Sequence, residues 1–304
     1  MRVIVAGLGI QGAKRSKFAG SDLVATVDPV KPDAQFTRVQ DVPLESYDAA
    51  LVCTPDEAKI EILSYLLDNG KHVLVEKPLV SEDDRDIERL RDLAAKRRVF
   101  CYTAYNHRFE PFLVRAREII TAGEIGKVLS LEMFYGNGTA REVRNSVWRD
   151  KGMGVLADLG SHLLDTTDFL LGEHRTDLKP FSYYRLENNS YDHVVFGSQA
   201  EMPRIQLEAT LLSWRNTFRL DVIGDAGSLH VNCLCKWGPS TITVRKRVLP
   251  SGRPTEASDT LECADPTWKL EYEYFVEHAK RGGTNLDNDL WINRTLRKLY
   301  EEGK

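Results

Sequence analysis

The sequence lacks the features that would place the chain in a membrane or in an oxidising compartment. No apolar run reaches the roughly 18–20 residues that a bilayer span requires, and the mean hydropathy is −0.35. There are only five cysteines, an odd number with no CxxC pair, which favours a reducing compartment over a disulfide framework. The first apolar segment is too short for a signal-peptide core. We therefore expect a soluble, cytoplasmic protein.

Neither sign of charge is in excess, because 41 lysines and arginines are mixed with 45 aspartates and glutamates. The formal net charge of −4 leaves no basic patch of the kind that nucleic-acid binding requires. A hydrophobic content of 42% with 28% charged residues is typical of a globular protein, and 304 residues favour two domains over one core. We therefore expect neither nucleic acid nor a membrane as partner.

The sequence contains no group of metal-binding residue types that is large enough to complete a metal site. Cys233 and Cys235 lie two apart in a strand-like stretch and are predicted to share one face, with His230 on the other. A second set has helical spacing but lacks a further ligand nearby: Asp158, His162 and Asp165. We predict no metal site.

The first third of the chain alternates between strand-like and helical segments. Apolar runs typical of buried parallel strands occupy residues 2–7, 23–28, 49–55, 72–78 and 99–105. Helical patterns fill the intervals: a short helix after Gly12, one over 57–70, and one that begins at Ser81, with Ser81 and Asp84 as a capping pair. The alternation predicts a doubly wound parallel sheet.

After Arg108 the pattern changes. Helices are expected over 109–122 and 153–171, and a strand over 127–137. Strand-like runs without helices between them then occupy residues 181–188, 192–201, 204–214, 218–224, 227–232 and 240–246. That succession indicates a mostly antiparallel sheet. Two helices, over 268–281 and 287–302, close the chain.

We therefore predict an α/β protein of two domains. Residues 1–108 form a Rossmann dinucleotide-binding domain, and residues 109–304 form an α+β domain with an open sheet for substrate binding and oligomerisation. The last helix is expected to pack back on the first domain.

A glycine motif follows the first strand. Gly7 permits a tight turn, Gly9 allows a pyrophosphate to reach backbone N–H groups, and Gly12 lets helix and strand pack closely. Asp28 ends the second strand 21 residues after Gly7, where an acidic residue holds the ribose hydroxyls of a dinucleotide. The same spacing suits an ordinary tight turn, but the strand before it, the helix after it and the acid favour a dinucleotide site.

Several motifs together resemble the glucose–fructose oxidoreductase / inositol dehydrogenase (Gfo/Idh/MocA) family. The most specific are Glu76-Lys77-Pro78 after a buried strand and the Asp158–His162 segment GVLADLGSHLLD at 154–165. The others, in order, are CTP at 53–55, YNHRFEP at 105–111, AGEIGKV at 122–128 and WR at 148–149. One departure is clear: Asp56 and Lys59 stand where the family often has Asn and His, so contacts of those two positions are not transferred.

The resemblance implies a nicotinamide dinucleotide as redox partner and a sugar, cyclitol or sugar nucleotide as substrate. It implies catalytic roles for Lys77, His162 and Asp158, with His162 or Lys77 transferring the proton and Asp158 orienting the pair. Four residues apart on a helix, Asp158 and His162 are expected to share a face. The cofactor contacts implied beyond the glycines and Asp28 are Ile10, Gln11, Cys53, Thr54, Pro55, Glu76, Lys77 and Asn106. The substrate contacts implied are Lys77, Arg108, Trp148, Arg149, Asp158 and His162, with His107 in the same segment as Arg108.

The predicted activity is hydride transfer between NAD(P) and a secondary alcohol or ketone. Two alternatives are a dinucleotide-sensing regulatory protein without turnover, and an enzyme that uses tightly bound NAD transiently for sugar hydrolysis or elimination. NAD is favoured over NADP because the charge of Asp28 repels a 2′-phosphate, although Lys14, Arg15 and Lys31 could offset that repulsion.

A homodimer or homotetramer through the C-terminal sheet is also expected. Residues 206–211 alternate in polarity: Leu207, Ala209 and Leu211 are apolar, and Gln206, Glu208 and Thr210 are polar. Each strand therefore has an apolar side, and with few helices between the strands we expect that side to lack cover.

Overall fold

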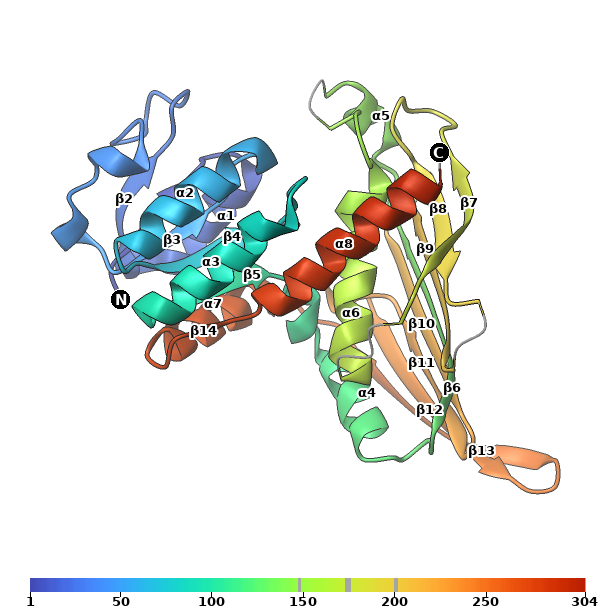
Figure 1. Cartoon of the computed structure of the whole chain (residues 1–304). Coiled ribbons are helices and arrows are strands. Elements are labelled where there is room, and N and C mark those ends of the chain that lie inside the picture. Colours follow the sequence, from blue (N-terminus) through green and yellow to red (C-terminus); the bar gives the residue numbers. More distant parts are fainter. Residues whose placement is uncertain (147–148, 173–175, 200–201, 304) are drawn as a thin grey trace. The chain divides into compact units, whose positions relative to one another are not determined.

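Short aliphatic strands and the helices between them build the first of two units, which comprises Met1–Asn106 and Thr267–Asn293. The structure, a computed structural model, describes residues 1–146, 149–172, 176–199 and 202–303. The strands of this unit are β1 (Val3–Ala6), β2 (Leu23–Val27), β3 (Ala49–Val52), β4 (His72–Glu76), β5 (Phe100–Ala104) and β14 (Gly283–Thr284). They pair in parallel in the order β14-β5-β4-β3-β1-β2, which confirms the Rossmann-type prediction (Figure 1).

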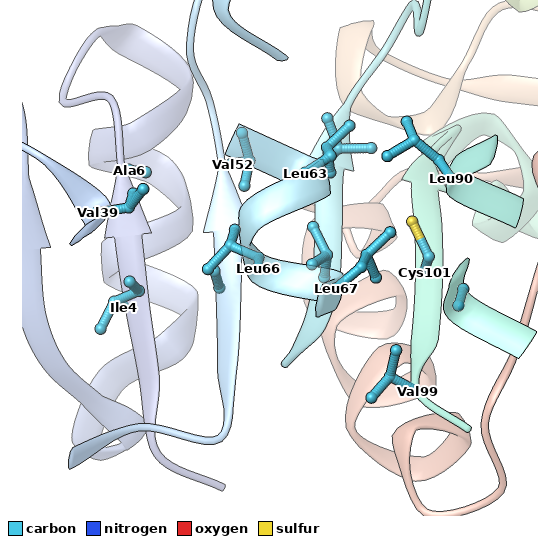
Figure 2. Close-up of a cluster of buried hydrophobic side chains, with 14 of the residues drawn as sticks. Ile4, Ala6, Val39, Val52, Leu63, Leu66, Leu67, Leu90, Val99 and Cys101 are labelled. Carbon is cyan, nitrogen blue, oxygen red and sulfur yellow. The ribbon is translucent and has the colours of Figure 1, made fainter. Parts of the chain in front are cut away.

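Helices cover this sheet and bury an aliphatic core against it. They are α1 (Ile10–Ala19), α2 (Asp56–Asp68), α3 (Asp84–Arg97), α7 (Thr267–Ala279) and the first half of α8 (Leu286–Glu302). In Figure 2, Leu63 of α2 lies beside Leu90 of α3, and both are fully buried, as are Leu66 and Leu67 of α2. The apolar face predicted for the second helix is therefore the one that packs on the sheet. β14 has two residues, too short for a strand pattern in the sequence.

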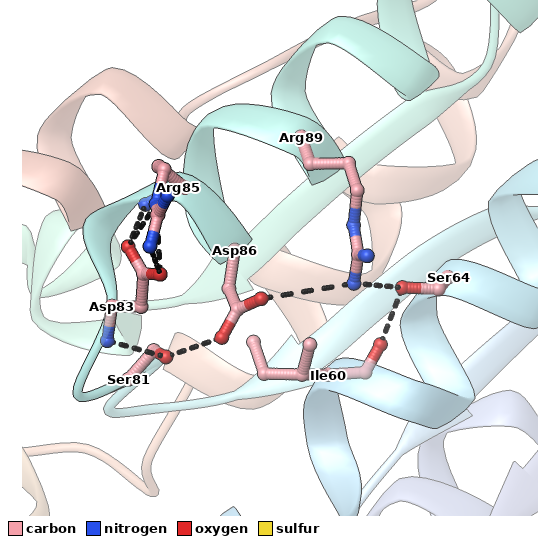
Figure 3. Close-up of polar contacts among 7 residues, drawn as sticks. All are labelled: Ile60, Ser64, Ser81, Asp83, Arg85, Asp86 and Arg89. Atoms are coloured by element: carbon pink, nitrogen blue, oxygen red, sulfur yellow. Dashed lines mark hydrogen bonds and ion pairs between the residues drawn. The ribbon is translucent and has the colours of Figure 1, made fainter.

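The predicted capping pair of the third helix is wrong. The helix begins at Asp84, three residues after Ser81, and its N-cap is Asp83, whose carboxylate accepts a 3.0 Å hydrogen bond from Arg85 N. Ser81 instead accepts from Asp83 N (3.2 Å) and donates to Asp86 (2.7 Å), as Figure 3 shows. A carboxylate directly before the helix reaches its free N–H groups, whereas Ser81 lies outside the first turn.

The second unit comprises residues from His107 to Pro266 together with the chain from Arg294 onward. Its strands are β6 (Val128–Gly136), β7 (Lys179–Tyr184), β8 (His193–Gly197), β9 (Arg204–Thr210), β10 (Thr217–Gly224), β11 (Gly227–Asn232), β12 (Ser240–Val248) and β13 (Gly252–Leu261). They form one sheet in the order β13-β12-β11-β10-β6-β9-β8-β7. Every pair is antiparallel except β6 with β9, which confirms the mostly antiparallel sheet.

Helices α4 (Pro111–Thr121) and α6 (Ser161–Leu171) lie along one face of this sheet (Figure 1). Leu207, Ala209 and Leu211 are buried, at most 1% exposed. Gln206 and Glu208 alternate with them and remain partly exposed on the other face. The expectation of an uncovered side at these apolar residues is therefore wrong: that side is packed, and the other face mixes polar residues with Phe134, Val195 and Ile223.

Two further differences concern the end of the sheet. β11 ends at Asn232, Cys233 has a positive φ of 65° and Cys235 lies in a 3-10 turn, so these cysteines do not share a strand face. β13, which the sequence did not predict, is exposed almost throughout, and a strand exposed on both faces carries no apolar alternation.

The division into units differs from the predicted domains at the C-terminal end. The first break, after Asn106, lies two residues from the predicted boundary, and Thr267–Asn293 belong to the first unit. Among the described residues, no helix has the length and apolar character that crossing a membrane would need.

Candidate active site

The glycine motif forms the turn between β1 and α1. Gly7 has a φ of +90°, and a Cβ there would lie 2.6 Å from the carbonyl oxygen of Cys53. A Cβ on Gly12 would lie 1.8 Å from the carbonyl oxygen of Gly7. Both glycines are therefore required by internal packing. A Cβ on Gly9 would meet nothing within 4 Å, so its small size serves no contact inside the protein.

The N-terminus of α1 is suited to an anion. Gly9 is the N-cap, no side chain caps the helix, and the first turn carries no acidic residue. The first N–H groups of a helix have no partner within the helix and lie at the positive end of its dipole. Ile10, 80% exposed, and the exposed Gln11 begin this helix. Open space at Gly9 and uncapped N–H groups together fit the pyrophosphate of a dinucleotide.

Asp28 ties the end of β2 to the glycine turn. One carboxylate oxygen accepts from Leu8 N at 2.7 Å, and the other accepts from Val30 N at 2.8 Å and Lys31 N at 3.0 Å. Burial alone raises the pKa of this carboxyl, but the three backbone donors and Lys31 together lower it below the usual value. A carboxylate offers about four acceptor positions, so one remains for a ribose hydroxyl.

The predicted CTP segment lies beside this turn. Cys53 N donates to Ala6 O at 2.7 Å, directly after β3. Pro55 is the N-cap of α2, and Thr54 lies between them. The backbone of this segment therefore forms the wall against which Gly7 packs.

Glu76 belongs to a buried ion cluster. The guanidinium of Arg15 donates from Nε to Glu76 at 2.7 Å and pairs through Nη2 with Glu271 at 2.7 Å. It also lies 4.3 Å from the ring centroid of Trp268. Arg15 is 1% exposed, and Glu271 is fully buried. Burial lowers the pKa of Arg15, but the two carboxylates outweigh it and raise that pKa above its usual value. The sequence missed this cluster, because Glu271 lies about two hundred residues from Glu76.

Lys77 and Asn106 follow the ends of the neighbouring strands β4 and β5. Lys77 is half-buried directly after β4. Asn106, 7% exposed, donates from Nδ2 to the hydroxyl of Thr267 at 2.9 Å. This hydrogen bond ties the end of β5 to the first residue of α7.

In the second unit, His162 stacks on His107. The ring centroids lie 4.2 Å apart at an interplanar angle of 22°. Tyr135 of β6 approaches both rings, with centroids 5.3 Å from His107 and 5.9 Å from His162. The two imidazoles are 2% and 7% exposed, respectively. The sequence analysis did not single out Tyr135, although its inward position follows from the alternation along β6.

Asp158 lies in a π-helical turn, Leu156–Gly160, and not in the regular helix predicted for it. Because a π turn changes the residue spacing, an i,i+4 face shared with His162 no longer follows from the sequence. Its carboxylate contacts Arg149 Nη2 at 3.4 Å. Burial raises the pKa of Tyr135, and the negative charge of Asp158 adds to that increase. Trp148 lies outside the described residues.

Arg108 is anchored in an ion cluster on α6. Its Nε and Nη2 donate to Asp165 at 2.9 and 2.8 Å, and Nη2 also contacts Asp168 at 3.2 Å. Asp165 is fully buried. This arrangement fixes the neighbouring His107 relative to α6, a structural role that the sequence did not indicate. Among the described residues, no group of three metal-ligating side chains is present.

Comparisons with known proteins give matches in both parts of the chain. Residues 1–105 match the model described as "Oxidoreductase family, NAD-binding Rossmann fold", and residues 113–230 match the "GFO/IDH/MocA C-terminal domain". The scyllo-inositol 2-dehydrogenase (NAD(+)) of Bacillus subtilis is 26% identical over 328 residues, covering 95% of this chain and 89% of the relative. A levoglucosan dehydrogenase of Pseudarthrobacter phenanthrenivorans is 28% identical over a shorter stretch, 40% of this chain and 32% of the relative.

A solved structure of a levoglucosan dehydrogenase in complex with NADH is similar over the whole chain. Its TM-score is 0.85, with 100% of this chain and 96% of that chain covered. The sequence identity of 17% means that this likeness shows a common fold.

Proposed function

Because the chain belongs to the GFO/IDH/MocA oxidoreductase family, we propose that it transfers a hydride between NAD and a secondary alcohol or ketone of a sugar, a cyclitol or a sugar nucleotide. The observation that supports this proposal most is the turn after β1, where the uncapped N-terminus of α1 and the open space at Gly9 adjoin the carboxylate of Asp28. Relatives named inositol and levoglucosan dehydrogenase support the substrate class.

NAD would supply the hydride acceptor when it is bound. The N–H groups of α1 would hold its pyrophosphate, and Asp28 would accept a hydrogen bond from the adenosine ribose. Of the three cations that could offset repulsion between Asp28 and a 2′-phosphate, Arg15 is committed to Glu76 and Glu271. Its guanidinium is therefore not available to offset that repulsion, which supports NAD over NADP as the cofactor.

We assign the transfer of the substrate's hydroxyl proton to Lys77 or His162. An alcohol that loses a hydride must also lose its hydroxyl proton, and an imidazole or an amine is a suitable acceptor. The stack of His107 on His162 and the nearby phenol of Tyr135 fix the orientation of the His162 ring. We assign Asp158 to the same polar group, acting with Arg149. Either Lys77 or His162 could be the group that transfers the proton.

The test combines a substrate screen with paired variants. Purified protein is mixed with NAD and with sugars, cyclitols and sugar nucleotides in turn, and NADH formation is followed by absorbance. Lys77→Met and His162→Asn should each lower turnover by about 10²–10⁴-fold. Their NAD affinity should change by less than about tenfold, which corresponds to 1.4 kcal/mol.

Matched controls make this result interpretable. His193 lies on the sheet strand β8, and Lys71 lies directly before β4. His193→Asn and Lys71→Met should therefore keep turnover within about twofold. NAD binding without turnover on any substrate would favour a dinucleotide sensor, and product release without net NADH would favour a transient use of NAD.

We further propose a homodimer or homotetramer that uses the C-terminal sheet. The outer face, on which Phe134, Val195 and Ile223 lie among polar residues such as Gln206 and Glu208, supports such an interface, because the opposite side of the sheet is already packed. Light scattering at micromolar concentration tests this, and the mass of a single chain would contradict it. A cytoplasmic location stays a prediction of the sequence.

A further inference from the structure

A single ammonium group holds the two backbone carbonyls on either side of Lys77. Lys59 Nζ donates to Glu76 O at 2.7 Å and to Pro78 O at 2.7 Å. The same Nζ pairs with Asp56 Oδ1 at 2.7 Å, one turn earlier on α2. Lys59 is 2% exposed, although it is the one residue on the buried face of α2 that carries a charge.

The three contacts use the whole donor capacity of the side chain. A lysine ammonium has three N–H donors, and Lys59 has three oxygen partners at equal distance. Nothing remains with which this group would bind a ligand. Its effect on any reaction must therefore pass through the backbone that it holds.

That backbone lies where the sheet no longer restrains it. The pairing of β4 with β5 ends at Glu76 and Ala104, so Lys77 follows the last residue of the ladder. Lys59 fixes the oxygen of the peptide plane that joins Glu76 to Lys77 and the oxygen of the plane that follows Pro78, so the Lys77–Pro78 plane lies between two restrained planes. The direction in which the Lys77 side chain leaves the backbone is then set by Lys59.

We propose that Lys59 is a positioning residue for Lys77, an inference that rests on the catalytic role assigned to Lys77 above. Asp56 completes the device by balancing the buried charge. The family often has Asn and His at the positions of Asp56 and Lys59. The Asp56–Lys59 pair and its backbone contacts are therefore a feature of this chain's own sequence.

The test is a double-mutant cycle with Lys59→Met, Lys77→Met and the two together. Misplacement of a reacting group by about 1 Å can cost about 10²-fold, so Lys59→Met should lower kcat by about 10–10²-fold. The KM for NAD should change by less than about threefold, because no dinucleotide contact is removed. In the Lys77→Met background, Lys59→Met should have no further effect, since its action passes through Lys77.

Lys71→Met is the matched control. Lys71 Nζ also donates to two backbone carbonyls, those of Leu44 at 2.6 Å and Tyr47 at 2.8 Å, within the same unit. The Lys71→Met substitution removes a comparable pair of hydrogen bonds to backbone carbonyls that do not adjoin Lys77. We expect its kcat to stay within about twofold of the wild-type value.

Hydrogen exchange read by mass spectrometry gives a measurement independent of turnover. The peptide containing residues 76–81 should exchange at least about tenfold faster in Lys59→Met and not in Lys71→Met. Unchanged exchange of this peptide, or losses of kcat that add in the double variant, would overturn the inference. Loss of turnover in Lys77→Met with normal turnover in Lys59→Met would also overturn it, while the proposed function would stand.

Discussion

The buried cluster of Arg15, Glu76 and Glu271 allows a sharp test of how the first unit is held together. Arg15→Met removes a cation that lies 2.7 Å from both carboxylates, and leaves an uncharged, unbranched side chain in its place. The side chain of Glu76 is 11% exposed and that of Glu271 is fully buried, so water cannot replace the guanidinium at Glu271. The substitution therefore leaves buried negative charge without its partner.

The magnitude follows from that burial. Removal of one partner from a buried ion pair costs about 3–5 kcal/mol, whereas an exposed pair contributes about 0–1 kcal/mol. With a urea m-value of about 2–3 kcal/mol/M, the midpoint of unfolding should fall by about 1–2.5 M. Replacing all three residues together, as Arg15→Met, Glu76→Gln and Glu271→Gln, should recover more than half of the loss.

The loss should also depend on pH. In the wild-type protein the carboxylates are stabilised by Arg15, whose own pKa they raise. In Arg15→Met the fully buried carboxyl of Glu271 takes a folded-state pKa above its unfolded value of about 4.3. The folded state then binds more protons than the unfolded state, so stability increases as the pH falls toward about 4.3. The difference between variant and wild type should shrink over that range.

Urea unfolding at several pH values, followed by fluorescence and circular dichroism, measures both effects. Lys14→Met is the matched control, because Lys14 is exposed on the same helix and its Nζ lies 4.9 Å from the same Trp268 ring. The control should lose less than about 1 kcal/mol. If Arg15→Met unfolds within 1 kcal/mol of Lys14→Met, or if its loss is the same at every pH, the cluster does not stabilise the unit as argued.

The remaining predictions concern the dinucleotide turn and the histidine stack. Gly12→Ala should destabilise the protein by about 1–3 kcal/mol, because its methyl group would meet Gly7 O. Gly9→Ala should leave the melting temperature unchanged, since a Cβ there meets nothing within 4 Å, but should weaken NAD binding at least about tenfold in calorimetry. Asp28→Asn should reduce the NAD-over-NADP affinity ratio by about tenfold in the same assay; an unchanged ratio would contradict the role of its charge. Since hydrogen bonds lower the pKa of Asp28, wild-type NAD affinity should stay constant from about pH 8 to about pH 5. His107→Ala should lower kcat by about tenfold or more with KM for NAD and the melting temperature unchanged, and a clearly lowered melting temperature would indicate a folding defect instead.

The hydrophobic pattern along the chain was sufficient to predict most of the secondary structure of this protein. Five strands of the parallel sheet follow from continuous aliphatic runs such as Val3–Ala6, because a strand buried on both faces must be apolar throughout. The glycine turn and Asp28 could be placed for the same reason, since their roles depend on backbone geometry within a single strand–turn–helix segment. Alternating polarity likewise predicted most strands of the second sheet.

Features outside these local patterns were missed or misplaced. β14 is too short for a pattern, and β13 is exposed on both faces and has no alternation. The N-cap of α3 was placed two residues early, because Ser81 and Asp83 both suit a cap and only the backbone geometry selects between them. The π turn that carries Asp158 was read as a regular helix, since the two differ by hydrogen bonding and not by composition.

Only the tertiary structure decided the partners of the polar groups. Arg15 and Glu76 form a buried cluster because α7 brings Glu271 beside them. Lys59 finds its backbone acceptors 17 and 19 residues later in the chain, and Tyr135 of β6 lies beside His107 and His162. Apolar burial depends on the periodicity of one segment, whereas a charge can be buried only where distant segments supply its counter-charge and hydrogen bonds.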